Sequence, residues 1–211
     1  MLHLARNLNR SWDAARAAAR IADLGIAPGR SVGSLSGGQQ AQLALTIALA
    51  KRPRMLILDE PLARLDPLAR HEFMSVLMAA VAEDDLSVIF SSHAVAELER
   101  VADYLIALHS GRLQVDGEVD DLLARHQVLT GPVAEITEHA KRVAPVHVTR
   151  AGTLAHELVR TSGPADPVPP CLEAHAVGLE ELVLAYLREP GAAALPGPAA
   201  ALAGGSAGAR P

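Results

Sequence analysis

The chain has 211 residues, 50% hydrophobic and 20% charged, which is typical of a globular protein with one sizeable core, alone or with a small appendage. Its net charge of −5 and its 2% aromatic content argue against a free-standing nucleic-acid binder, which relies on basic surface and aromatic stacking. The single cysteine excludes an internal disulfide and fits a reducing compartment. No apolar run reaches the ~18 residues of a membrane span and no secretory signal is visible, so we expect a soluble, cytosolic chain.

The first fifty residues are predicted to be mostly helical. Apolar residues recur at helical spacing over residues 14–24, with Ser11 as the candidate N-cap and Gly25 as the stop. A second helix is expected after Ser36, because a Ser-x-x-Gln capping box starts there, and it should end before Pro53. Apolar residues cover most of its circumference, which predicts deep burial.

Strands and helices then alternate. Two short apolar runs, residues 54–59 and 86–91, are typical of interior strands of a parallel sheet. Asp66, followed by a proline, predicts the start of a helix between them, and another helix is expected at about 95–101. Residues 104–117 predict a hairpin. This alternation indicates an α/β fold.

The pattern changes from about Val128. Short β-leaning segments and a helix at 179–188 predict a small α+β appendage. Residues 190–211 are almost entirely Ala, Gly and Pro, which cannot bury a core, so we expect a disordered tail there.

One motif is typical of an anion site. The sequence LSGGQ, residues 35–39, places two glycines at the expected start of a helix, where backbone N–H groups and the positive end of the helix dipole attract anions. An isolated motif of this kind also occurs as an ordinary glycine-rich helix cap.

Acidic residues follow the first predicted strand. Asp59 and Glu60 stand at its carboxyl end, where ligands collect in open α/β sheets. An aspartate there can hold Mg²⁺ through water and a following glutamate can polarise an attacking water. Asp66 follows, and His93 stands just past the next strand. Taken alone, the acidic pair is equally typical of a solvated loop, and the histidine of a residue that satisfies local backbone groups.

Together, these four landmarks resemble the ATP-binding cassette (ABC) ATPase family in order and spacing. LSGGQ matches the family's signature motif, MLILDE its Walker B motif, LARLDP its D-loop and His93 its switch histidine. Residues 178–187 look more loosely like the terminal helix of many bacterial transporter ATPases. The resemblance implies a partial P-loop NTPase core with a helical subdomain, carrying the appendage and tail described above.

The resemblance also implies roles for individual residues. ATP and Mg²⁺ would be the ligands, and the signature motif would contact ATP held by an opposing protomer. The implied roles are phosphate binding by Ser36, Gly37, Gly38 and Gln39, Mg²⁺ binding through water by Asp59, general-base catalysis by Glu60, γ-phosphate contact by His93, and communication across the dimer by Asp66.

The family's P-loop, G-x-x-x-x-G-K-[ST], is not found among these residues, because both lysines, Lys51 and Lys141, follow alanine. We therefore expect an N-terminally truncated ABC ATPase domain over residues 1–126, with marginal stability, uncovered sheet edges and no ATP hydrolysis by the isolated chain. Its parts would be a helical subdomain over 1–50 and a core over 54–126, followed by an accessory region over 127–189 and the tail.

The implied partners are a membrane-spanning permease subunit and a second ATPase protomer, which would hold the chain at the cytoplasmic face of the membrane. The alternative is a non-catalytic half-cassette that supplies its signature motif to an intact partner. DNA-repair and translation ATPases of the superfamily are less well matched, because coiled-coil insertions and tandem cassettes are not seen. A serine hydrolase is disfavoured, because the stretch GSLSG, residues 33–37, has Leu35 where the G-x-S-x-G motif places its serine. An H-E-x-x-H metalloprotease is disfavoured, because His71 and Glu72 are followed by Phe73, Met74 and Ser75.

Overall fold

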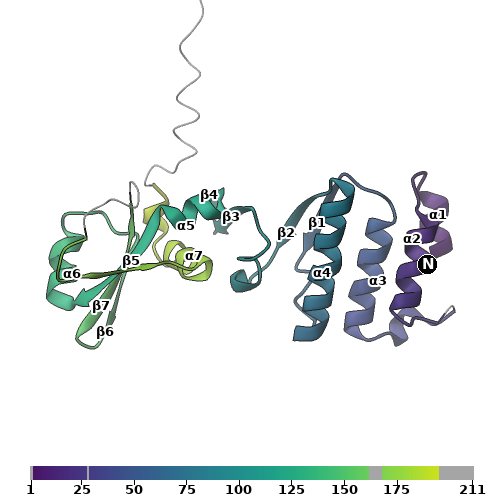
Figure 1. Ribbon diagram of the computed structural model, residues 1–211, viewed down its shortest axis with the longest axis horizontal. Coiled ribbons are helices and arrows are strands. Elements are labelled where there is room, and N and C mark those ends of the chain that lie inside the picture. Colours follow the sequence, from purple (N-terminus) through teal and green to yellow (C-terminus); the bar gives the residue numbers. More distant parts are fainter. Residues whose placement is uncertain (1, 28, 162–167, 195–211) are drawn as a thin grey trace, which may run out of the picture. The chain divides into compact units, whose positions relative to one another are not determined.

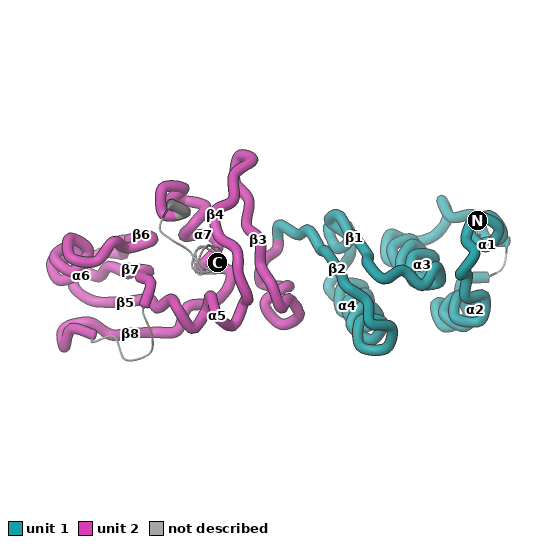
Figure 2. The backbone as a smooth tube through the Cα atoms, turned by 90° about the horizontal axis from the view of Figure 1, so that it is seen from above, with its two compact units in different colours: residues 1–93 teal, residues 94–211 magenta. Residues whose placement is uncertain are grey.

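The computed structural model describes residues 2–27, 29–161 and 168–194 (Figure 1). The chain forms two compact units, residues 1–93 and 94–211 (Figure 2), which are treated separately below. The predicted division between residues 126 and 127 lies inside the second unit, where strand β5 begins. Within the described residues, no helix is long and apolar enough to cross a membrane.

The first unit consists of a series of helices and one parallel pair of strands. Residues 55–59 and 87–91 pair in parallel, with Met55 opposite Ser87 and Asp59 opposite Ser91. The elements in order are α1 (Leu2–Leu8), α2 (Ala14–Asp23), the 3₁₀ helix η1 (Val32–Ser34), α3 (Gly37–Leu49), β1 (Met55–Asp59), α4 (Pro67–Asp84) and β2 (Ser87–Ser91).

Short side chains set the helix starts. The predicted Ser36 capping box at α3 is confirmed, and so is Asp66 as the N-cap of α4. At α2 the predicted cap, Ser11, is wrong: the helix starts later, and the Asp13 side chain accepts the Arg16 N–H at 2.9 Å. Gly25 follows the end of α2 with φ +61°, a left-handed conformation that glycine adopts without steric penalty.

Helix α3 lies between α2 and α4 (Figure 1). Five of its 13 residues are buried, all between Gln42 and Leu49, so the predicted deep burial holds only for its C-terminal part. A small cluster including Ile26 and Leu43 joins it to α2. The main core lies between α3, α4 and the strands, and its buried members are Leu45, Leu49, Leu56, Leu62, Leu65, Phe73, Leu77, Ala80 and Leu86.

The β1–β2 pair is covered on one face only within the described residues. Leu56 is 9% exposed, whereas Met55 is 57%, Ile57 68% and Ile89 54% exposed on the opposite face. The prediction of strands buried on both faces is therefore wrong for this structure, because α3 and α4 pack on one side of the pair. The uncovered apolar surface agrees with the expected uncovered core.

The second unit contains a β-hairpin and a four-stranded antiparallel sheet of order β6-β7-β5-β8. The predicted helix over 95–101 is wrong: no side chain caps its start at Ala94, and only the 3₁₀ helix η2 (Val95–Glu97) forms. The other elements are β3 (Tyr104–His109), β4 (Arg112–Glu118), α5 (Val119–Ala124), β5 (His126–Pro132), α6 (Val133–Ala140), β6 (His147–Ala151), β7 (Leu154–Arg160), β8 (Glu173–Ala176), α7 (Leu179–Arg188) and the 3₁₀ helix η3 (Pro190–Ala194).

The two faces of this sheet belong to two cores. Helix α6 packs on one face through Ile136, and helix α7 with the hairpin and α5 packs on the other through residues such as Leu182 (Figure 1). The predicted α+β character, the hairpin and the helix at 179–188 are confirmed. Residues 190–194 of the predicted tail form η3, and Ala192 packs into the α7 core, so the expected disorder is wrong for these residues. Residues 195–211 of that tail lie outside the described residues. The chain is a mixed α/β protein, as predicted.

Candidate functional site

The carboxyl ends of β1 and β2 carry the predicted carboxylates. Asp59 and Ser91 are the last residues of the two strands and lie opposite each other in the parallel register. The Ser91 hydroxyl donates a hydrogen bond to Asp59 Oδ1 at 2.7 Å. Both side chains are exposed, so a ligand can approach the free oxygen of the aspartate.

Glu60 turns sharply out of β1. Its backbone has φ +46°, which is uncommon for a residue with a side chain, and its N–H donates to Ser91 Oγ at 2.8 Å. Its carboxylate Oε2 lies 2.8 Å from His93 Nδ1, and the side chains are 41% and 75% exposed respectively. The Nε2 atom of His93 has no hydrogen bond within the described part of the chain. The structure thus brings Asp59, Glu60 and His93 together.

The signature motif forms the N-terminus of α3. Ser36 Oγ accepts the N–H of Gln39 at 3.2 Å, and Gln39 Oε1 accepts the N–H of Ser36 at 3.2 Å. The capping box therefore uses the third amide of the helix and leaves the amides of Gly37 and Gly38 without an acceptor among the described residues. Two free amides at the positive end of a 13-residue helix suit an anionic group.

The two glycines meet different neighbours. A Cβ at Gly38 would lie 3.2 Å from Ala69 Cβ on α4, which is a tight contact. A Cβ at Gly37 would lie 3.5 Å from the Arg64 carbonyl, an ordinary distance. Gly38 thus allows α3 to approach α4 closely, whereas the fold itself tolerates a methyl group at Gly37.

Asp66 has a local partner. Its Oδ1 accepts the N–H of Ala69 at 2.9 Å and thereby caps α4, with Pro67 as the first helical residue. The other carboxylate oxygen makes no hydrogen bond to the described residues. In this unit Asp66 fixes the start of a helix, and its predicted contact across a dimer remains a prediction.

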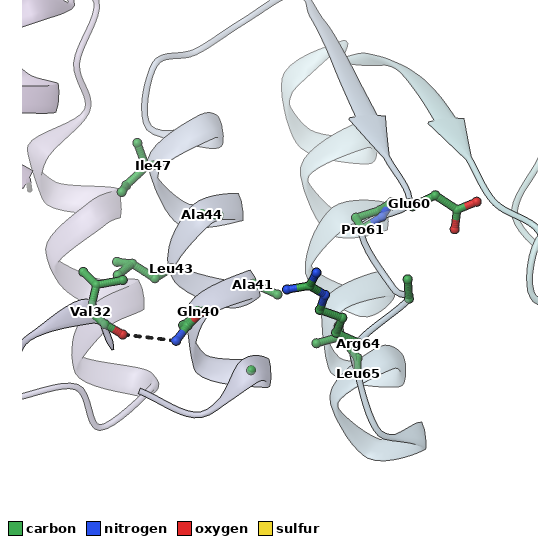
Figure 3. A pocket seen from close by; sticks show the side chains of 12 residues that line it. Val32, Gln40, Ala41, Leu43, Ala44, Ile47, Glu60, Pro61, Arg64 and Leu65 are labelled. Atoms are coloured by element: carbon green, nitrogen blue, oxygen red, sulfur yellow. Dashed lines mark hydrogen bonds between the residues drawn. The ribbon is translucent and has the colours of Figure 1, made fainter. Parts of the chain in front are cut away.

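A cavity of about 630 Å³ lies between α3 and the segment that follows β1 (Figure 3). Gly37 of the signature motif and Glu60 both line it, so the two predicted motifs share one hollow. Figure 3 shows the Arg64 side chain directed towards α3 and the Glu60 carboxylate directed away from it. The free amides of the signature motif and the Asp59–Glu60–His93 group therefore do not face one another within this unit.

Ser91 is the site residue that sequence reasoning missed. A serine at a strand end is unremarkable in the sequence, and only the register of β2 against β1 places it beside both acidic residues. The available signal was that both predicted strands end on a polar residue, Asp59 in one and Ser91 in the other.

The residues present fit the implied ligands chemically. Mg²⁺ prefers oxygen ligands and keeps several waters when it is bound by one or two carboxylates and by phosphates, which suits Asp59. The described residues contain no group of three or more His, Cys, Asp or Glu side chains that could hold a metal ion. A Mg²⁺ ion bound together with nucleotide phosphates does not need such a group, because waters and phosphate oxygens fill most of its coordination sites. The free Gly37 and Gly38 amides supply donors for a phosphate.

Part of the chain is similar to known ATP-binding proteins. The model of the ABC transporter family matches residues 2–63. The molybdenum import ATP-binding protein ModC of Aromatoleum aromaticum is 42% identical over 107 residues, which cover 50% of this chain and 28% of that protein. The phosphonates import ATP-binding protein PhnC 3 of Nostoc sp. is 38% identical over 91 residues, 43% of this chain and 35% of that protein.

A solved structure of an ATP-binding subunit of an ABC transporter is 27% identical and covers 57% of this chain and 52% of its own, with a TM-score of 0.49. The chain spans about a quarter to a third of the length of the curated relatives it matches. The match covers the signature motif and the Walker B carboxylates, Asp59 and Glu60. This stretch of the chain is therefore similar to the ATP-binding proteins of the ABC transporter family.

Proposed function

We propose that this chain is part of the ATP-binding, ATP-hydrolysing subunit of an ABC transporter. The observation that carries the proposal is the hydrogen-bonded group at the ends of β1 and β2, in which Asp59, Glu60 and His93 are linked in one unit. The signature motif of the same unit, with the free amides of Gly37 and Gly38, gives it a second phosphate-recognising element.

Each residue has a chemical role in this proposal. Bound MgATP supplies a phosphoanhydride bond that water can cleave. Asp59 holds the magnesium ion through water, and Glu60 accepts a proton from the attacking water. His93 orients the Glu60 carboxylate through Nδ1 and keeps Nε2 for a phosphate oxygen. The Gly37 and Gly38 amides bind phosphate of a nucleotide held by a second ATPase protomer.

The proposed assembly has three kinds of component: this chain, a second ATPase protomer and a membrane-spanning permease, at the cytoplasmic face of the membrane. The named relatives are import ATP-binding proteins, which favours import. Their named substrates differ, molybdenum in one case and phosphonates in the other, so the proposal is limited to the transporter class.

Substitution of Glu60 and Gly37 in the assembled transporter tests this proposal. Glu60→Gln keeps the size of the side chain and removes the base, so we expect kcat for ATP hydrolysis to fall about 10²- to 10⁴-fold with little change in KM. Gly37→Ala should also impair turnover, because a methyl group obstructs the free amides while the fold tolerates it. Wild-type activity in both variants would refute the proposal.

The same pair of variants distinguishes the proposed ATP-hydrolysing subunit from the alternative, a non-catalytic half-cassette. A half-cassette that only supplies its signature motif needs Gly37 but not Glu60, so Gly37→Ala would then reduce hydrolysis and Glu60→Gln would not. One observation favours keeping this alternative: the 211 residues contain no P-loop sequence beside their intact signature motif. Ser31→Ala is a suitable control, because the Ser31 side chain caps nothing.

A further inference from the structure

We infer that Ser91 is a positioning residue that holds both Walker B carboxylate residues, Asp59 and Glu60, in their working geometry. The inference rests on the proposed function and adds to it a residue that neither the motifs nor the relatives point to. Its basis is one hydroxyl group with two partners: Ser91 Oγ donates to Asp59 Oδ1 at 2.7 Å and accepts from the Glu60 N–H at 2.8 Å.

The register of the sheet explains why a single hydroxyl reaches both residues. Asp59 and Ser91 lie opposite each other at the ends of parallel strands, so their side chains project from the same face. The bond from Ser91 occupies one carboxylate oxygen of Asp59 and fixes the rotation of the group. The second oxygen then points in a defined direction. A carboxylate oxygen that binds Mg²⁺, or a water held by Mg²⁺, must be oriented in this way.

The second bond acts on the backbone of Glu60. With φ +46°, Glu60 has left the extended conformation, and its N–H can no longer continue the ladder with β2. A non-glycine residue in this region is disfavoured by roughly 1–2 kcal/mol, and it persists only where surrounding contacts hold it. The Ser91 hydroxyl is such a contact, and it sets the direction in which the Glu60 side chain leaves the strand.

Ser91 also helps to position His93, because the two residues are close in the chain and both contact Glu60. Only Ser92 separates the two residues, and His93 Nδ1 contacts Glu60 Oε2 at 2.8 Å. Asp59, Ser91, Glu60 and His93 therefore form a continuous hydrogen-bonded path between two strand ends. Removing the hydroxyl breaks that path at the point where it passes from the aspartate to the glutamate.

The experiment compares Ser91→Ala, Ser91→Thr and Ser87→Ala. Threonine keeps the hydroxyl and suits a strand. Ser87 is the matched control, since it lies on the same face of β2 and its hydroxyl has no hydrogen bond among the described residues. In the assembled transporter we expect Ser91→Ala to lower kcat about 10- to 100-fold and to raise the Mg²⁺ concentration needed for half-maximal rate. Ser91→Thr should restore both, and Ser87→Ala should change neither.

A second readout uses the 211-residue chain itself and needs no activity. In the wild type and in Ser91→Thr, the Glu60 amide should be protected from hydrogen exchange, as measured by NMR. In Ser91→Ala its exchange rate should increase at least tenfold. An unaltered Glu60 amide, or a Ser91→Ala enzyme with wild-type kcat and Mg²⁺ dependence, would overturn the inference. A wild-type assembly without ATPase activity would instead refute the proposed function, and the exchange rates alone would then decide whether Ser91 holds Glu60.

Discussion

The Ser36 hydroxyl shows at the scale of one residue how a motif can serve both folding and ligand binding. It caps α3 by accepting the Gln39 N–H, and Gln39 reciprocates. We predict that Ser36→Ala lowers the free energy of unfolding by about 1 kcal/mol, because the cap is lost. Ser31→Ala should leave it unchanged, since Ser31 precedes η1 without capping it. Urea unfolding measures both, and equal midpoints for the two variants would contradict the role of the cap.

Asp66 carries a similar prediction for α4. Asparagine retains an acceptor for the Ala69 N–H, whereas alanine does not. Asp66→Ala should therefore lower the free energy of unfolding by about 1 kcal/mol, and Asp66→Asn by a few tenths at most. Comparing both variants in urea unfolding and in ATPase assays separates the cap from a role across a dimer. A loss of hydrolysis in Asp66→Asn at unchanged stability would indicate that the charge acts beyond the cap.

Local chemistry explains which site residues the sequence could reveal. Ser36, Asp59, Glu60 and His93 stand in short motifs whose meaning depends on neighbours in the chain. Ser91 has its partners 31 and 32 positions away, and it acquires them through the register of two strands. That register follows from packing of the strands against α3 and α4, which no local pattern specifies.

At the scale of elements, capped helices were the most predictable. Helices α3 and α4 begin where Ser36 and Asp66 predict, because each cap accepts a hydrogen bond from the amide three residues further along the chain. The helix expected at 95–101 had apolar spacing alone, and without a cap it forms only the turn η2. Apolar spacing predicts which side chains will be buried, whereas a capping residue determines where the backbone can start a helix.

The contact between β5, β7 and α7 predicts how the second unit responds to acid. His126 is buried between the Leu122 carbonyl, at 2.6 Å from Nδ1, and the Tyr186 hydroxyl, at 2.9 Å from Nε2, and Arg160 also binds that hydroxyl. Burial lowers the pKa of His126 below its ordinary 6.5, and the nearby Arg160 charge lowers it further.

The sign of the effect follows from proton uptake. Below pH 6.5 the unfolded chain binds a proton at this histidine, whereas in the folded chain the histidine stays neutral to lower pH. The free energy of unfolding is therefore highest above pH 6.5 and decreases as the pH falls. We predict that the free energy of unfolding of the second unit decreases by up to about 1.4 kcal/mol per pH unit between pH 6.5 and 5.5. Hydrogen exchange of α7 amides at several pH values measures it.

Two variants isolate this histidine. His126→Gln should flatten the slope with pH, whatever it does to stability at neutral pH, because the titrating group is gone. His175→Gln is the matched control on the same sheet, since the His175 side chain is 54% exposed. A slope that persists in His126→Gln would assign the acid sensitivity to another group.

At the scale of the whole chain, the uncovered face of β1–β2 predicts how the protein behaves in solution. Met55, Ile57 and Ile89 present apolar surface beside strand edges that no other described strand pairs with, a combination that favours association between chains. Ile57 and Ile89 are direct partners in the parallel register, so they form the centre of this surface. We predict concentration-dependent self-association of the 211-residue chain, measurable by sedimentation velocity.

The double variant Ile57→Thr/Ile89→Thr tests that prediction. Threonine keeps the β-branched shape that suits a strand and replaces exposed methyl groups with hydroxyls, so association should weaken while the free energy of unfolding changes by less than about 0.5 kcal/mol. Leu56→Ala changes the adjacent, buried residue and should give the opposite result, a loss of about 2–5 kcal/mol without a gain in solubility. Undiminished association of the double variant would mean that another surface, such as the exposed side of the β3–β4 hairpin around Ile106, holds the chains together.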